Sequence, residues 1–276
     1  MSPTIQQMTI DEFAESRIAL GDPVKKFGSA YWVRTRRLFF RPLLSHEACL
    51  LSEAHLPVTR LGGFQCVVSL PQDANSVMKF VVLDDVRDYD LERLRHDRRL
   101  LIKNAAKRFA VRPVQDIGQL MEEGFEAYGS FYERTGYGYQ KERVRRERYD
   151  HWVDCVLKCP KTVILGGYDQ RERLHALSLS YWVGHTLHYT TFFAETEALR
   201  HGVGELMFHA VRELARRTCG IREVLVRRYQ GGNGMDNYYL RRGAKLIAKP
   251  SKLHLDSASR WILKSFFPVK YAILCE

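Results

Sequence analysis

The stretch Leu199-Arg200-His201-Gly202-Val203-Gly204-Glu205 decides how this chain folds. It joins residues 187–193, an aromatic-rich run typical of a strand, to residues 205–217, whose apolar spacing predicts a helix. A strand, a loop ending in Gly-x-Gly and a helix together present main-chain N–H groups to a phosphate, because glycine allows close approach and a helix start carries unpaired donors. An isolated Gly-x-Gly also forms ordinary turns, so the surrounding sequence has to support the phosphate-binding interpretation.

Length and charge narrow the class of protein. The chain has 276 residues, 45% hydrophobic and 27% charged, which is ordinary for a globular protein of one large or two small domains. Its 43 Lys and Arg residues outnumber 32 Asp and Glu residues, giving a formal net charge of +11. This excess predicts attraction to polyanions such as nucleic acid, an anionic membrane face or a phosphorylated cofactor. A basic surface that serves solubility alone is the alternative.

Cysteine usage and hydropathy predict the compartment. The six cysteines contain no Cys-x-x-Cys pair, and Cys155 with Cys159 does not complete a metal site, so we expect reduced thiols and no metal. The N-terminus lacks the basic and apolar regions of a signal peptide. No apolar run reaches the roughly 18–20 residues that span a bilayer. The sequence therefore predicts a cytoplasmic protein without a transmembrane segment.

The second half of the chain alternates strand and helix patterns in a fixed order. Three strands form an antiparallel meander before the Gly-x-Gly loop, with Gly184-His185 as one turn. The helix at 205–217 follows, then a short apolar strand at 223–226. The turn cluster Gln230-Gly231-Gly232-Asn233-Gly234 leads into a last helix that Gly243 ends.

This order resembles the GNAT superfamily of N-acyltransferases. The pyrophosphate signature of that family is Q/R-x-x-G-x-G/A at the start of its central helix. Gly202 and Gly204 match the two small positions, whereas Leu199 departs from the Q/R position and Arg200 follows it. The later signature, an aromatic residue four positions before a helix-ending glycine, is matched by Tyr239 and Gly243.

The upstream sequence resembles a narrower group. Residues 94–111 are similar to the R-x-x-I-R-K-A-x-x-x-G-V helix of the Fem-type aminoacyltransferases, and residues 131–137 resemble the helix that follows it there. That group carries two GNAT-like halves, of which the first is degenerate. The resemblance implies an α/β fold with a central, mostly antiparallel sheet, splayed strands and flanking helices. It also implies a degenerate N-terminal half at 1–115 and an acyltransferase domain at 116–276.

The resemblance implies acetyl-CoA or another acyl-CoA as cosubstrate, and it directs the choice of site residues. Tyr239 is the candidate proton donor to the departing thiolate, with a packed aromatic as the alternative. His188 and Glu195 are the candidate general bases, although a lone strand histidine is more often structural. The candidate cofactor-binding residues lie in two loops: Arg200, His201, Gly202, Val203, Gly204, Glu205 and Asn233.

Three functions stay open on the sequence. The first is transfer of an acyl group from acyl-CoA to an amine acceptor. The second is Fem-type transfer from aminoacyl-tRNA, and the third is an inactive GNAT-like binding module. The basic helices expected at 91–108 and 143–158 form a solvated surface or hold a tRNA or a phosphorylated carrier. Arg227 and Arg228 would select an acidic substrate or bind a nucleotide phosphate, and a homodimer is also open.

Overall fold

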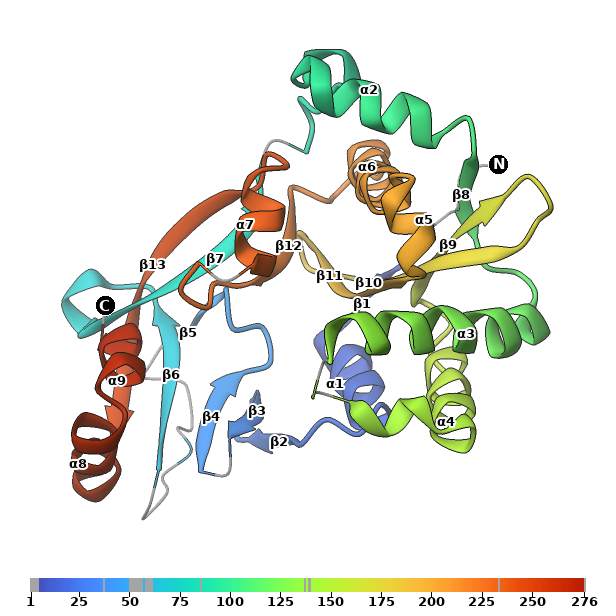
Figure 1. Ribbon diagram of the computed structural model, residues 1–276. Helices are drawn as coiled ribbons and strands as arrows, with labels where there is room; N and C mark the ends of the chain where they lie inside the picture. The colour runs from blue at the N-terminus through green and yellow to red at the C-terminus, as the bar shows by residue number, and fades with distance from the viewer. Residues whose placement is uncertain are drawn as a thin grey trace. The chain divides into compact units, whose positions relative to one another are not determined.

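The computed structural model of the chain describes residues 5–275 except 37, 50–56, 58–61, 85, 137, 139 and 233 (Figure 1). Two compact units interleave along the sequence. Unit 1 comprises Met1–Ser16 and Leu83–Val226, and unit 2 comprises Arg17–Val82 and Arg227–Glu276. The division expected at residue 115 lies inside unit 1, so it does not coincide with the boundary between these units and stays a prediction.

Unit 1 is built on a mostly antiparallel sheet. Strands β8 to β11 pair in sequence order and antiparallel, and β12 then pairs with β11 in parallel. These strands are β8 (Phe109–Pro113), β9 (Val163–Asp169), β10 (Leu174–Val183), β11 (Thr186–Ala194) and β12 (Glu223–Arg228), and the short β1 (Gln7–Met8) pairs with β10. The helices are α1 (Ile10–Ala19), α2 (His96–Ala105), α3 (Ile117–Thr135), α4 (Arg146–Leu157), α5 (Thr196–Arg200) and α6 (Val203–Arg217).

Helices α6 and α3 cover opposite faces of this sheet (Figure 1). A Cβ at Gly167 of β9 would meet Val203 and Met207 of α6, so this glycine lets the helix approach the strand closely. Val203, Met207, Val211 and Ala215 recur every fourth residue and are all fully buried, which fixes the face that α6 presents to the sheet. The helix predicted at 205–217 is therefore confirmed and begins two residues earlier.

The predicted splay of two parallel strands is present between β11 and β12. Among the described residues the two strands pair only through Thr186–Glu223, Leu187–Val224 and His188–Leu225, although β11 continues to Ala194. A bulge follows at once, because Ser180 pairs with Tyr189 but Leu179 pairs with Thr191, which leaves Thr190 as an extra residue. Bulges bend a strand and increase its twist, which accounts for the separation from β12.

The strands of unit 2 pair in the order β2-β3-β4-β6-β13-β7. The late strand β13 lies between β6 and β7 and is antiparallel to both. The strands are β2 (Val24–Phe27), β3 (Ala30–Arg36), β4 (Phe39–Pro42), β5 (Ala48–Cys49, beside β6), β6 (Gly63–Val68), β7 (Ser76–Leu83) and β13 (Lys245–Leu255), and the helices are α7 (Gly234–Leu240), α8 (Ser257–Phe266) and α9 (Pro268–Cys275). Trp32, Phe40 and Phe64 anchor its core. The predicted class, mixed α/β with a mostly antiparallel sheet and flanking helices, is confirmed.

Candidate functional site

The Gly-x-Gly loop forms the start of α6, and Gly202 is the residue that caps the helix. Its φ of +86° lies in the left-handed region, which residues with a Cβ rarely adopt. A Cβ there would also lie 3.2 Å from the Cβ of Ala105 and 3.6 Å from the carbonyl oxygen of Leu101, both in α2. Helix α2 therefore packs directly against the loop, and glycine is required by conformation and by space.

Main-chain hydrogen bonds narrow the choice of phosphate-binding donors. The N–H of Gly202 donates to the Leu199 carbonyl at 3.0 Å, and the N–H of Glu205 donates to the Gly202 carbonyl at 3.0 Å. These two donors serve the loop itself. Val203 and Gly204 remain as the candidate donors to a ligand at this helix start.

The charged side chains around the loop are partnered within unit 1. Glu205 is buried, and its carboxylate pairs with Arg98 of α2 at 2.8 Å. His201 Nδ1 lies 2.9 Å from an Arg108 guanidinium nitrogen, and Arg200 bonds Glu197 at 2.9 Å with 72% of its side chain exposed. Arg98 and Arg108 were missed as loop residues, although the sequence placed both in the basic segment.

That basic segment is shorter than expected. The helix predicted over 91–108 is an α-helix only at His96–Ala105, after a 3-10 turn at Leu91–Arg93. The helix predicted over 143–158 likewise begins at Arg146, after a 3-10 turn at Lys141–Val144. In α4, Arg146 bonds Glu122 and Asp150, so part of the expected polyanion-binding charge is used inside the protein.

His188 lies at the last paired position before the splay. It is buried, with 6% exposed, and its ring centroid is 5.3 Å from that of Phe13 in α1. The next residue, Tyr189, contacts Phe208 of α6. Because successive strand side chains point to opposite faces, His188 faces away from α6. Its role as a general base stays a prediction.

Glu195 belongs to a partly buried polar cluster at the end of β11. Its carboxylate accepts from His175 Nδ1 at 2.8 Å and from Arg173 at 3.1 Å, and His175 Nε2 lies 3.2 Å from Asp169. Although burial of Asp169 opposes it, hydrogen bonds from the Arg173 main chain and His175 lower the pKa of that carboxyl. The sequence missed Asp169 and His175, but the β10–β11 pairing brings residue 175 next to 195.

This cluster predicts a structural effect for Glu195. We expect Glu195→Ala to lower the free energy of unfolding by about 1–2 kcal/mol, because His175 and Arg173 lose a shared acceptor. Urea denaturation measures this, with the exposed Glu197→Ala as the matched control, for which we expect less than about 0.5 kcal/mol. Unchanged stability together with a large fall in turnover would make Glu195 the general base instead.

Tyr239 lies in unit 2 on α7 and is 5% exposed. Burial raises its pKa, and the neighbouring Tyr238 adds to the shift, so the phenol keeps its proton at neutral pH. The turn before α7 is held by the fully buried Asp236, which accepts from the main-chain N–H of Gln230 at 2.9 Å and of Gly232 at 3.1 Å. Asn233 lies outside the described residues.

A second feature of unit 2 is a group of guanidinium side chains, which we call the arginine cluster: Arg36, Arg41, Arg227 and Arg228. Arg41 is buried, and burial together with repulsion from Arg228 and Arg36 lowers its pKa to about 9. Burial and repulsion from Arg227 and Arg36 lower the pKa of Arg228 as well.

The arginine cluster has little negative charge to balance it. Arg41 donates to the neutral Thr35 and Gln65 at 3.1 and 3.4 Å. Arg227 pairs with Asp236 at 3.3 Å, and the same carboxylate attracts Arg228 electrostatically, although no ion pair to Arg228 is formed among the described residues. Buried cations without counter-charges are costly, so this arrangement suits an anionic ligand.

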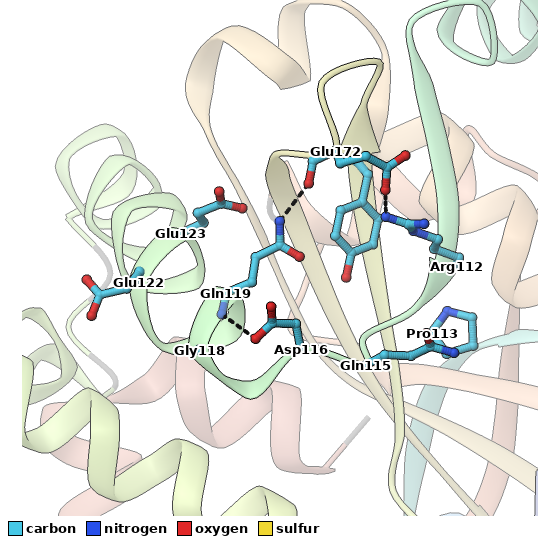
Figure 2. A pocket seen from close by; sticks show the side chains of 10 residues that line it. Arg112, Pro113, Gln115, Asp116, Gly118, Gln119, Glu122, Glu123 and Glu172 are labelled. Carbon is cyan, nitrogen blue, oxygen red and sulfur yellow. Dashed lines mark hydrogen bonds and ion pairs between the residues drawn. The ribbon is translucent and has the colours of Figure 1, made fainter.

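A hollow of about 580 Å³ in unit 1 has the opposite electrostatic character (Figure 2). It lies beside the start of α3, where Asp116 accepts from the Gln119 N–H at 3.1 Å. Glu172 pairs with Arg112. Burial is the main cause that raises the pKa of Tyr168, and the carboxylates of Glu123 and Asp116 add to the shift. With α3 on the face opposite α6, this acidic hollow is separate from the Gly-x-Gly loop and disfavours a pyrophosphate.

The described residues also bear on metal binding and on membrane insertion. They contain no group of three or more His, Cys, Asp and Glu side chains arranged to hold a metal ion. None of their helices is long and apolar enough to cross a bilayer.

Comparison with known proteins identifies the fold. No protein-family profile and no curated protein sequence matches the chain. FemX superimposes with a TM-score of 0.61 at 9% identity, over 91% of this chain and 92% of FemX. The chain has the tandem GNAT-like fold of FemX.

Two further structures extend this similarity. The C-terminal domain of an Agrobacterium fabrum protein described as a lysylphosphatidylglycerol synthetase gives a TM-score of 0.58 at 10% identity, over 94% of this chain and 93% of the domain. A conserved protein of unknown function from Bacteroides thetaiotaomicron gives 0.52 at 12% identity, over 91% and 93%. At these identities the similarity concerns the fold, which agrees with the GNAT and Fem-type resemblance of the sequence.

Proposed function

We propose that the protein is an N-acyltransferase that moves an acyl group from acyl-CoA, with acetyl-CoA as the first candidate, to an amine of its acceptor. The observation that carries this proposal is the end of β11–β12 pairing at His188–Leu225 in the unit that also holds the Gly202 helix start. Where two strands stop pairing, main-chain groups can hold an extended ligand arm instead. A helix start with glycines can hold its pyrophosphate.

The acceptor is proposed to carry an anionic group beside its amine. Arg41 and Arg228 support this, because both are cations held at least partly out of water and repelled by their neighbours. A phosphate or carboxylate on the acceptor supplies the missing counter-charge. This extends the expectation from sequence that Arg227 and Arg228 select an acidic substrate, with Arg227 now paired to Asp236.

Transfer from aminoacyl-tRNA is the second candidate. It is favoured by the packing of α2 against Gly202 and by the Arg98–Glu205 ion pair, which place a helix and a carboxylate beside the start of α6. Aminoacyl-tRNA has no pyrophosphate, so its binding does not require free N–H groups in that loop. An inactive binding module remains the third candidate.

Calorimetric titration of nucleic-acid-free protein distinguishes these candidates. We expect acetyl-CoA or a longer acyl-CoA to bind with micromolar affinity. No heat with either thioester, together with aminoacyl transfer from charged tRNA, would replace the acyl-CoA proposal with the tRNA-dependent one. Binding of neither donor would favour the inactive module.

Tyr239 is proposed as the proton donor to the thiolate, on the resemblance and on its protonated state. We expect Tyr239→Phe to lower kcat about tenfold or more while leaving the KM for acyl-CoA nearly unchanged. Steady-state kinetics measure both constants, with Tyr238→Phe as the matched control. An unchanged kcat would make Tyr239 a packing residue.

A further inference from the structure

Helix α8 places large apolar side chains in water. Trp261 is 63% exposed, Phe266 is 65% exposed and Ile262 is 44% exposed, and no residue of the helix is buried. Phe267 and Val269, which follow it, are 46% and 72% exposed. Five of the fifteen exposed large hydrophobic residues in the described chain thus lie within Trp261–Val269, including all of the exposed aromatic ones. We call these five residues the α8 face.

The helix is held in place at its start and through α9. Asp256 caps α8 by accepting from the Ser259 N–H at 3.0 Å, and the Gly62 main-chain N–H donates to Ser259 Oγ at 3.0 Å. Near the end of α9, the Leu274 carbonyl accepts from Gln65 at 3.3 Å. These bonds attach the α8–α9 segment, drawn in red in Figure 1, to the sheet of unit 2 without covering Trp261 or Phe266.

An isolated helix of this length is marginal in water, and so large an exposed apolar area marks an interaction site. The rings of Trp261 and Phe266 pack edge to face with centroids 5.8 Å apart, so the α8 face is an ordered surface. Ile262 and Phe266 are four residues apart and share one side of the helix, and Arg260 and Lys264 share another. Trp261 lies between these two sides, three residues before Lys264. A helix with aromatic and aliphatic residues on one side and basic residues on the other is typical of membrane-surface helices.

Charge decides between a membrane and a second copy of the chain. Helix α8 carries Arg260 and Lys264 and no acidic residue, and Asp256 is engaged as the helix cap. In a symmetric dimer the same basic residues would meet one another, which opposes pairing through this face. An anionic lipid headgroup layer attracts them instead, in keeping with the overall charge of +11.

We propose that the α8 face binds reversibly to the surface of anionic lipid bilayers, with Trp261, Phe266 and Phe267 inserted at the headgroup level and Arg260 and Lys264 facing lipid phosphates. One short helix has little apolar area, so the binding is weak and depends on the anionic lipid. This inference is independent of the proposed acyl transfer, because no reacting group lies in α8.

Vesicle co-sedimentation of the full chain tests this. We expect binding to phosphatidylcholine vesicles that contain phosphatidylserine, and about tenfold weaker binding without phosphatidylserine or in high salt. Trp261→Ser with Phe266→Ser should lower the partition constant about tenfold or more. Ile117→Ser, which removes a residue 51% exposed on α3, is the matched control and should bind as the wild type does.

The Trp261 fluorescence gives an independent readout. Of the other three tryptophans, Trp32 and Trp152 are buried and Trp182 is half-buried with its indole N–H bonded to the Gly184 carbonyl. We therefore expect a blue shift of emission on adding anionic vesicles, which Trp261→Phe abolishes without abolishing sedimentation. Equal binding to neutral vesicles, or no vesicle binding at all, would overturn the proposal. A concentration-dependent dimer that Trp261→Ser and Phe266→Ser dissociate would assign the α8 face to a second copy instead.

Discussion

Replacing Gly202 by glutamate is expected to abolish acyl-CoA binding. The new side chain has to adopt a φ of +86° with its Cβ 3.2 Å from Ala105, so the start of α6 must shift. The carboxylate also brings a negative charge to a helix start that is proposed to hold a pyrophosphate. Calorimetry with acetyl-CoA should show at least a hundredfold loss of affinity, about 2.7 kcal/mol.

Gly202→Asn separates charge from conformation. Asparagine tolerates the left-handed region better than other residues with a Cβ and carries no charge. We expect it to weaken acyl-CoA binding less than the glutamate variant does, with far-ultraviolet circular dichroism showing both variants folded. If the glutamate variant folds and binds acyl-CoA as tightly as the wild type, the loop has no part in holding the cofactor.

The sequence predicts most of unit 1 because its signals are local. Val203, Met207 and Val211 lie four positions apart and define the buried side of α6, and Gly184-His185 marks the turn of the β10–β11 hairpin. The splay was expected from the resemblance, but its cause was not. The bulge at Thr190 depends on the register between two strands, which alternation of apolar residues does not reveal.

Pairs of side chains distant in sequence were the main omission. Arg98 forms an ion pair with Glu205, and Arg41 is repelled by Arg228, only because separate elements pack together. Charge counting predicted a solvated or polyanion-binding basic face, yet Arg98 neutralises a buried carboxylate. The effect of such contacts on a pKa or a site follows from burial, which a single sequence does not specify.

The two units exchange segments of the chain because strands distant in sequence pair with one another. Strand β13, near the end of the chain, pairs with β6 and β7 from its beginning, through contacts such as Leu253–Gln65 and Ile247–Phe80. Local sequence patterns do not reveal pairing between such distant segments, and the division expected at residue 115 stays a prediction. The turn before α7 is a smaller example. Its glycines are visible in the sequence, but the hydrogen bonds that Asp236 accepts from Gln230 and Gly232 are seen only in the structure.

Replacing Arg228 by methionine is expected to remove anion binding from unit 2 while raising stability. Arg228 is partly buried and repelled by Arg227 and Arg36, so a methionine of similar reach removes an unfavourable charge and keeps the aliphatic packing. We expect the free energy of unfolding to rise by about 1 kcal/mol. We expect the affinity for inorganic phosphate, measured by calorimetry, to fall at least tenfold, about 1.4 kcal/mol.

The neighbouring arginine supplies a control of opposite sign. Arg227 pairs with Asp236, which is fully buried, so Arg227→Met should lower the free energy of unfolding by about 1–3 kcal/mol. An arginine that binds an anionic ligand can destabilise the ligand-free protein. An arginine with a structural role is paired with a carboxylate of the protein itself. Opposite shifts of the urea midpoint would place Arg228 in the first class and Arg227 in the second. If both variants are destabilised and both still bind inorganic phosphate, Arg228 is a structural residue, and the anionic group of the acceptor does not bind at the arginine cluster.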